Sequence, residues 1–313
     1  MEYRNLGRSG LQVSTIGLGC NNFGMRSDYE ATVAVVNKAL DLGITLFDTA
    51  DVYGGQGKSE EFLGKALGSR RQDVIVATKF ASPMGDGPLN RGASRRYIMS
   101  ACEASLRRLN TDYIDLYQIH RPDSSTPIEE TMGALDDLVT AGKVRYIGHS
   151  NFSGWQTAEA HYVAQRDHLT PFISAQNEYS LLDRRVEGEL VPAVQKFDVS
   201  VLPFFPLASG FLTGKYRQGE ALPEGTRLAG AGPMASRLLN DRNFETLGKL
   251  ERFATEHNHS MLELAIGWLA NKPYVGSVIA GATRPEQVEQ NAAAGDWKMS
   301  SEEMAEVDAL AKR

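Results

Sequence analysis

The chain has 313 residues, of which 42% are apolar and 23% charged, so it can bury a large core and is not expected to be disordered. Its net charge of -6 argues against general nucleic-acid binding, which usually leaves a basic footprint. No apolar run approaches the roughly 20 residues of a membrane-spanning helix, and the N-terminus lacks the pattern of a signal peptide. With only two cysteines, Cys20 and Cys102, the composition fits a reducing cytoplasm.

Short apolar runs alternate with stretches of helical periodicity along most of the chain. Residues 3–19 predict an N-terminal β-hairpin that leads into the first of eight strands. The predicted strands are residues 15–18, 45–49, 74–79, 113–120, 146–150, 173–177, 199–203 and 277–280. The predicted helices include residues 29–42, 60–67, 94–109, 128–141, 155–165, 186–196 and 285–294.

This alternation predicts the fold class. Repeated strand–helix units are typical of a parallel sheet, and eight of them in a chain of this length predict a closed (β/α)8 TIM barrel rather than an open sheet. No linker or change in composition divides the chain, so residues 1–313 are expected to form a single domain.

Two regions interrupt the alternation. Residues 210–240 are rich in Gly, Pro and Arg and predict a long surface loop, which in a compact domain is usually functional or mobile. Residues 300–312 predict an extra amphipathic C-terminal helix, because Ser300 and Glu303 have the spacing of a capping box.

Polar and ionisable residues stand at the ends of several predicted strands. They are Asp48, Lys79, His120, Ser150, Asn151, Gln176 and Asn177. The carboxyl ends of the strands of a parallel barrel share one face, and that face holds the active site, so these side chains are expected to converge. Tyr53 follows Asp48 by five residues and is expected to join them.

Four of these residues form a chemical unit. A tyrosine has an ordinary pKa of about 10 and is alone a poor proton donor or base at neutral pH. A nearby ammonium such as Lys79 favours the phenolate, and a carboxylate such as Asp48 keeps that lysine charged and oriented. His120 is suited to hydrogen-bond the substrate oxygen or to relay the proton. If Tyr53 donates a proton to a carbonyl oxygen, the carbon needs a hydride source, which implies a nicotinamide.

With these residues in place, the sequence resembles the aldo-keto reductase family over essentially its whole length. Residues 47–54 and 59–60 resemble the first signature of that family, and residues 142–152 resemble its middle signature. The overall pattern is similar to the bacterial branch, which also resembles the potassium-channel β subunits. The resemblance implies a catalytic tetrad of Asp48, Tyr53, Lys79 and His120.

The resemblance also implies NADP(H) as the cofactor and assigns its contacts. At the nicotinamide it assigns Ser150, Asn151, Gln176 and the stacking ring of Phe204. It also assigns Gly19, Cys20, Asn21 and Asp48 as cofactor contacts. Along the pyrophosphate it assigns Pro206, Leu207, Ser209 and Gly210, and it adds Phe205 and Lys215 as further cofactor contacts. At the adenosine end it assigns Gly281, Thr283, Arg284, Gln287, Gln290 and Asn291.

One of these assignments has support from the residue type itself. The resemblance implies that Thr283 and Arg284 bind the 2′-phosphate, which favours NADPH over NADH. For Arg284 the residue type agrees, because a guanidinium at the start of a helix is well suited to a phosphate. Two positions depart from the family pattern. Gln290 stands where many relatives have Glu, and Phe205 stands where a small polar residue is common.

The implied activity is the NADPH-dependent reduction of an aldehyde or ketone, with no metal, on a small carbonyl or alcohol substrate. Two other hypotheses stay open. The protein is alternatively an NADPH-binding redox sensor or regulatory subunit with little turnover, or a barrel enzyme of another chemistry such as a metal-dependent lyase. The strand ends lack the additional His and acid cluster that a metal site requires. The oligomeric state is also open, although the absence of an obvious apolar interface stripe favours a monomer.

Overall fold

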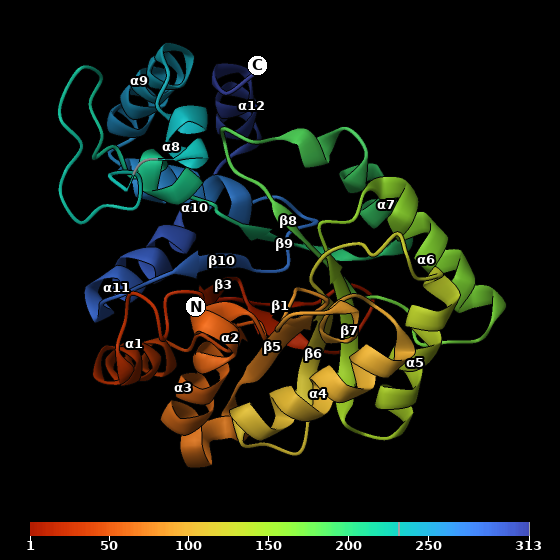
Figure 1. Cartoon of the computed structure of the whole chain (residues 1–313). Helices are drawn as coiled ribbons and strands as arrows, with labels where there is room; N and C mark the ends of the chain where they lie inside the picture. Colours follow the sequence, from red (N-terminus) through yellow and green to blue (C-terminus); the bar gives the residue numbers. More distant parts are fainter. Residues whose placement is uncertain (231, 313) are drawn as a thin grey trace.

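Eight parallel strands form a nearly closed barrel at the centre of the protein (Figure 1). The computed structural model describes residues 1–230 and 232–312. The barrel strands are β3 (Ile16–Gly19), β4 (Leu46–Asp48), β5 (Ile75–Phe80), β6 (Ile114–Ile119), β7 (Val144–Ser150), β8 (Ser174–Glu178), β9 (Ser200–Phe204) and β10 (Val278–Gly281). Strand β10 returns beside β3, and a bridge from Val201 to Val275 brings the two ends of the sheet together. The predicted (β/α)8 barrel is confirmed.

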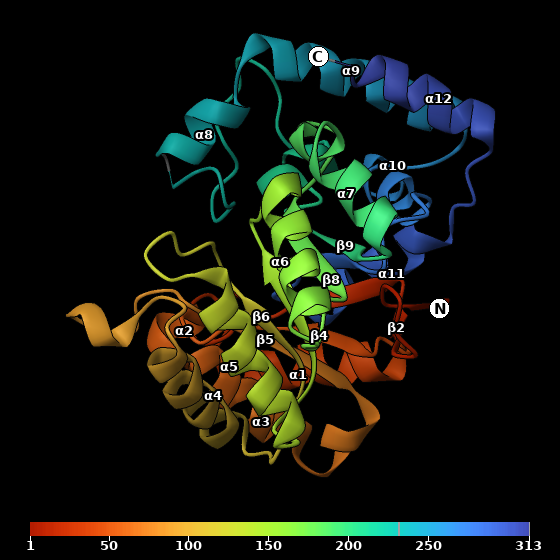
Figure 2. The same cartoon turned by 90° about the vertical axis from the view of Figure 1, so that its right-hand side faces the viewer.

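Helices connect successive strands and surround the barrel (Figures 1 and 2). They are α1 (Tyr29–Asp41), α2 (Tyr53–Gln56), α3 (Lys58–Leu67), α4 (Arg95–Leu109), α5 (Ile128–Thr140), α6 (Gly154–Arg166), α7 (Leu190–Phe197), α8 (Pro233–Leu238), α9 (Asp241–Glu256), α10 (Met261–Ala270), α11 (Pro285–Ala293) and α12 (Ser301–Leu310). The C-terminal helix α12 lies beside α9, and Ser300 and Glu303 form the predicted capping box. Among the described residues, no helix is long and apolar enough to cross a membrane.

Two segments differ from the sequence prediction. In place of one helix over residues 186–196, a short turn at Arg185–Glu187 precedes α7, because Gly188 supports a helix poorly and Glu189 is not helical. The predicted loop over residues 210–240 contains the short helix α8. This helix begins at Pro233, and proline is favoured at the first position of a helix because it lacks only an N–H that would be unpaired there.

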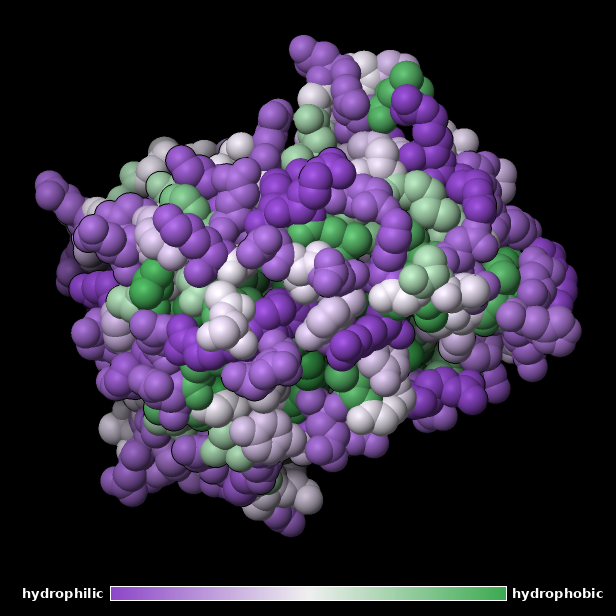
Figure 3. Space-filling view, turned by 90° about the horizontal axis from the view of Figure 1, so that it is seen from below, coloured by the Kyte–Doolittle hydropathy of each residue, from purple (hydrophilic) through white to green (hydrophobic). Residues whose placement is uncertain are grey.

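The alternation of side chains along the strands separates the barrel interior from the layer under the helices. In the interior, Leu46 and Leu116 pack in one apolar cluster with Leu6 and Val13. The last two belong to the N-terminal hairpin of β1 (Tyr3–Asn5) and β2 (Gln12–Ser14), as predicted. The hairpin therefore covers the amino-terminal end of the barrel, so the opposite end is left for polar residues. On the outer surface seen in Figure 3, hydrophilic residues predominate and apolar residues occur in small groups.

Helix α3 approaches α4 closely at Gly64, which predicts an effect of substitution. A Cβ at Gly64 would lie 2.3 Å from the main-chain oxygen of Leu109, so Gly64→Ala must push the two helices apart. We expect it to lower the free energy of unfolding by ~1–3 kcal/mol in chemical denaturation. The control is Gly133→Ala in α5, where the added Cβ meets no atom within 4 Å outside its own helix among the residues that the structure describes. Because alanine favours helix by up to ~1 kcal/mol over glycine, this control should be stabilising, and equal effects of both changes would contradict the packing argument.

Candidate active site

Asp48 and Lys79 form a buried ion pair inside the barrel, at the carboxyl ends of β4 and β5. The Lys79 Nζ lies 2.7 Å from Asp48 Oδ2 and 2.8 Å from the main-chain oxygen of Thr49. The side chain of Lys79 is 0% exposed and that of Asp48 is 5% exposed. Burial acts to lower the pKa of Lys79, but Asp48 and the Tyr53 phenol raise it, and the net pKa lies above the ordinary value. Lys79 therefore stays charged at neutral pH.

Two glutamine side chains hold the second oxygen of Asp48. Gln176 donates to Asp48 Oδ1 at 2.8 Å, and Gln118 donates to the same oxygen at 3.4 Å. Sequence reasoning assigned Gln176 to the cofactor and did not assign Gln118. The signal for Gln118 was available, since it follows the inward-facing Leu116 by two residues on β6 and alternation returns it to the interior.

Tyr53 begins the short helix α2 shortly after β4, and its ring faces the Lys79 ammonium. The Lys79 Nζ is 5.1 Å from the centroid of the Tyr53 ring. Burial raises the pKa of Tyr53, and the lysine ammonium opposes this effect without reversing it. Sequence reasoning expected Lys79 to favour the phenolate. In the structure burial outweighs that attraction, so Tyr53 keeps its proton at neutral pH and is suited to donate it.

His120 lies next to Tyr53, as the sequence predicted. The two rings meet edge to face with centroids 5.7 Å apart. The Ser82 Oγ is 3.2 Å from His120 Nδ1, and a hydrogen bond donated by Ser82 would leave the imidazole proton on Nε2. Burial, together with Lys79 and Arg121, lowers the pKa of His120 to about 3. The imidazole is therefore neutral at physiological pH and can serve as a hydrogen-bond donor rather than as an acid.

The residues predicted to hold the nicotinamide carboxamide join the ends of three neighbouring strands. Ser150 Oγ donates to the main-chain oxygen of Gln176 at 2.7 Å. The Asn151 side chain donates to the main-chain oxygen of His120 at 2.9 Å and to Ser150 Oγ at 3.0 Å. Asn151 has a φ of 61°, which asparagine tolerates better than most residues, so the chain turns sharply here. These contacts keep Ser150 and Asn151 close to His120.

The segment after β9 is a tight turn in which several residues are left-handed. Phe204 and Phe205 meet edge to face with ring centroids 5.3 Å apart. Left-handed φ angles follow at Phe205, Ala208, Ser209 and Gly210. The main-chain N–H groups of Ala208 and Gly210 already donate to main-chain oxygens inside this turn, at 2.9 and 2.8 Å. The hydroxyl of Ser209 is buried and has no hydrogen-bond partner in the described part of the chain, so this hydroxyl is free to bind a pyrophosphate.

Three further residues of this segment were predicted to contact the cofactor. Pro206 is buried and Leu207 is half-buried, whereas Lys215 is exposed. A Cβ at Gly210 would lie 3.0 Å from the Lys215 Nζ, so this ammonium lies against the same turn. Its charge complements the anion that the turn would bind.

The predicted adenosine site lies at the start of α11, beyond β10. Thr283 donates to Gln287 Oε1 from its main-chain nitrogen at 2.8 Å and from its hydroxyl at 3.1 Å. Arg284 is exposed at the N-cap position. Gln290 is exposed, while Asn291 is 6% exposed and faces the protein. An exposed guanidinium at a helix N-terminus fits a phosphate group.

The turn over residues 19–22 lies beside this site. A Cβ at Gly281 would lie 3.3 Å from the Asn21 side chain, and Asn22 donates to the main-chain oxygen of Ala282 at 3.3 Å. The side chain of Cys20 is fully buried in the core, and burial raises its pKa well above the ordinary value. The thiol of Cys20 is therefore not exposed to a ligand, and only its main chain is available for the predicted contact.

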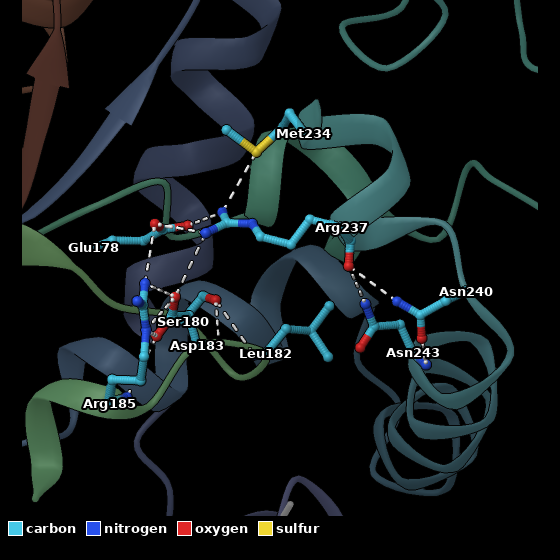
Figure 4. Close-up of polar contacts among 9 residues, drawn as sticks. All are labelled: Glu178, Ser180, Leu182, Asp183, Arg185, Met234, Arg237, Asn240 and Asn243. Atoms are coloured by element: carbon cyan, nitrogen blue, oxygen red, sulfur yellow. Dashed lines mark hydrogen bonds and ion pairs between the residues drawn. The ribbon is translucent and has the colours of Figure 1, made fainter. Parts of the chain in front are cut away.

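A cluster of ion pairs anchors the long segment that follows the β9 loop (Figure 4). Arg237 of α8 pairs with Glu178 at the end of β8 and lies 3.8 Å from Asp183. Asn240 and Asn243 both donate to the main-chain oxygen of Arg237, at 2.9 and 3.3 Å. This cluster ties α8 to the carboxyl end of the barrel.

Arg227 in the same segment was not assigned by sequence reasoning, although it reaches the site. Its Cζ lies 5.0 Å from the centroid of the Phe205 ring. Burial and the neighbouring Arg26 lower the pKa of Arg227, and Tyr53 opposes them. Arg227 therefore adds a positive charge close to Tyr53. A loop residue of this kind has no periodic signal in the sequence, and only the folded path of the chain brings it here.

Comparison with known proteins agrees with the geometry of the site. Residues 15–312 match the Aldo/keto reductase family. The chain is 40% identical over 303 residues to a probable voltage-gated potassium channel subunit beta from Oryza sativa, covering 95% of this chain and 92% of that protein. It is 36% identical over 320 residues to L-glyceraldehyde 3-phosphate reductase from Escherichia coli, with 98% and 92% covered. It is 34% identical over 330 residues to versiconal hemiacetal acetate reductase from Aspergillus parasiticus, with 97% and 95% covered. The chain belongs to the aldo/keto reductase family.

The buried ion pair predicts a non-additive stability effect. Lys79→Met leaves the Asp48 carboxylate buried without its partner, and we expect the free energy of unfolding to fall by ~3–5 kcal/mol. Asp48→Asn combined with Lys79→Met removes both charges and should cost less than the sum of the two single changes. The control is Lys249→Met on α9, whose partner Glu245 is exposed, and it should cost less than ~1 kcal/mol. Additive losses in urea denaturation would contradict the coupling of Asp48 and Lys79.

Proposed function

We propose that the protein is an NADPH-dependent reductase that converts an aldehyde or ketone to the alcohol, with Tyr53 as the proton donor. The observation that carries this proposal is the position of a protonated phenol over a lysine that Asp48 keeps charged. The phenol lies beside the neutral imidazole of His120, so two hydrogen-bond donors adjoin one another at the carboxyl end of the barrel. A carbonyl oxygen is the group that such a pair of donors would bind.

Each member of the tetrad has a distinct part in the proposed reaction. When bound, NADPH would supply a hydride to the carbonyl carbon. Negative charge develops on the carbonyl oxygen, and Tyr53 transfers its proton there. The Lys79 ammonium stabilises the phenolate that remains, and Asp48 keeps that ammonium charged and fixed in place. His120 orients the oxygen through a hydrogen bond from its neutral ring.

The residues that would hold NADPH extend from the barrel mouth to α11. Phe204 would contact the nicotinamide ring, Lys215 and the left-handed turn the pyrophosphate, and Arg284 the 2′-phosphate. Arg227 is a further candidate for a phosphate, since its charge lies beside Phe205 and has no ion-pair partner in the described part of the chain. The exposed Arg284 supports a preference for NADPH over NADH, because NADH lacks the 2′-phosphate.

The proposed substrate is a small carbonyl compound, or the alcohol in the reverse direction. The names of the relatives include a phosphorylated aldehyde and a hemiacetal acetate, which supports carbonyl chemistry without selecting one compound. We further propose that residues 1–313 act as one domain. Both cysteines are buried free thiols, which supports a reducing compartment such as the cytoplasm.

A second candidate is an NADPH-binding regulatory subunit with little turnover. It is favoured by the 40% identity to proteins named as probable potassium channel β subunits. The two candidates share the cofactor site and differ in catalysis, so turnover measured on cofactor-bound protein separates them.

The substitution Tyr53→Phe tests the proposed reaction. We expect wild type and variant to bind NADPH with affinities within about threefold in a fluorescence titration, and both to bind NADH more weakly. With a panel of aldehydes and ketones, the variant's kcat should fall by about 10²–10⁴-fold, because its ring has no proton to give. The control is Tyr162→Phe on the surface of α6, where the tyrosine is 53% exposed, and turnover should be unaffected.

Three results would overturn parts of this proposal. Undiminished turnover by the Tyr53→Phe variant would remove Tyr53 as the proton donor. NADPH binding without turnover by wild type would favour the regulatory subunit. A protein that binds neither NADPH nor NADH would contradict the cofactor assignment.

A further inference from the structure

A second group of ionisable residues lies behind the proposed active site, between β5 and the helices α3 and α4. Glu60 accepts a hydrogen bond from Thr78 of β5. On its other oxygen, Glu60 accepts from Arg108 Nε at 2.6 Å. The side chain of Glu60 is 0% exposed and that of Arg108 is 17% exposed, so this pair is largely shielded from water.

Asp51 adds a second acid to this group, two residues before Tyr53. Its main-chain nitrogen donates to the main-chain oxygen of Lys79 at 3.1 Å, which fixes the chain against β5. The residue is 1% exposed, and neither carboxyl oxygen accepts a well-formed hydrogen bond in the described part of the chain, although the Val52 main-chain N–H and the Tyr97 hydroxyl lie near the carboxyl group. A buried carboxylate without partners costs several kcal/mol, whereas a protonated carboxyl costs far less. Asp51 and Glu60 both lie near the guanidinium of Arg108, but this guanidinium is paired with Glu60.

We propose that Asp51 is a positioning residue for Tyr53, that it holds a proton at neutral pH, and that its ionisation in alkali disturbs the proposed active site. The inference rests on the proposed reductase chemistry wherever activity is measured. It goes beyond the tetrad, because Asp51 does not touch the reacting atoms and acts through the chain that carries Tyr53.

The charges around Asp51 determine how it titrates. Burial and, to a smaller extent, the neighbouring Glu60 raise the pKa of Asp51, while Arg108, the main-chain N–H of Val52 and Lys79 oppose the rise, and the net pKa is about 8. From α4 and β6 the hydroxyls of Tyr97 and Tyr117 also face Asp51, and burial raises the pKa of both phenols. Both phenols therefore stay neutral when Asp51 ionises. The positive charges that act on the Asp51 carboxylate are those of Arg108 and Lys79.

The same residues connect Asp51 to His120. The Tyr97 hydroxyl donates to the main-chain oxygen of Ser82 at 3.4 Å, and its pKa is raised by Asp51 as well as by burial, so it lies near the carboxyl group. Ser82 in turn lies 3.2 Å from His120 Nδ1. A negative charge on Asp51 thus acts on Tyr53 through two residues of chain and on His120 through Tyr97 and Ser82.

The direction of the pH dependence follows from the raised pKa of Asp51. In the unfolded chain Asp51 ionises near its ordinary pKa of 3.8, and in the folded chain near 8. Its contribution to stability is therefore fully present below pH 3.8 and is lost as the pH rises through 8. Activity limited by Asp51 should fall in the same alkaline range, well below the raised pKa of Tyr53.

The substitution Asp51→Asn tests this inference, because asparagine has nearly the same shape and does not ionise. We expect the alkaline limb of kcat/KM to move to higher pH by about one unit or more in this variant. The fall in melting temperature between pH 6 and pH 9 should also be smaller than in wild type. The control is Glu61→Gln, which neutralises the exposed acid beside Glu60 on α3 and should leave both profiles as in wild type.

Infrared spectroscopy of wild-type protein provides a readout that depends on neither activity nor the folding of a variant. A protonated carboxyl band should be present at pH 6.5, lost by pH 9.5, and missing from Asp51→Asn if that variant folds. Absence of the band in wild type, or an unchanged alkaline limb in folded Asp51→Asn, would overturn the inference. A wild type without turnover at any pH would refute the proposed function instead, and the infrared and melting measurements would still decide the state of Asp51.

Discussion

The charge on Lys79 is the constraint on which the rest of the site depends. A lysine at 0% exposure would lose its proton unless a carboxylate stood against it, and Asp48 stands at 2.7 Å. Asp48 in turn needs the donors Gln176 and Gln118 on its other oxygen, since a buried carboxylate is costly when any lone pair is unsatisfied. The barrel supplies these four side chains from four different strands. The arrangement therefore exists only when the sheet is nearly closed.

The protonation states of Tyr53 and His120 depend in part on the Asp48–Lys79 ion pair. Burial keeps the proton on the phenol, and in the proposed reaction the nearby ammonium would make the phenolate less costly. The same ammonium, with burial, keeps the imidazole neutral, so His120 can orient an oxygen without competing for the proton. Behind them, Asp51 is buried near Glu60, and the Arg108 guanidinium is already paired with Glu60.

The sequence predicted the barrel, which is confirmed, and the convergence of Asp48, Tyr53, Lys79 and His120, because both depend on local patterns. The catalytic roles of these four residues stay predictions. Alternating apolar runs define the strands, and Asp48, Lys79 and His120 stand at their ends. Gln118 was within reach of the same rule and was missed, because it was read as part of an apolar run. Arg227 and α8 could not be predicted in this way, since their positions depend on the path of a long segment and on the pairing of Arg237 with Glu178. The individual cofactor contacts at Ser209, Lys215 and Arg284 stay predictions.

The measurement that tests the account most directly is the fate of hydrogen from the cofactor. Wild-type protein is given NADPH deuterated at the transferable C4 position and an aldehyde that it turns over, and the alcohol is analysed by mass spectrometry and NMR. Direct transfer to a carbonyl held by Tyr53 and His120 predicts deuterium on the carbinol carbon and a solvent proton on the oxygen. An alcohol without deuterium on that carbon would contradict hydride transfer, and with it the reductase that we propose.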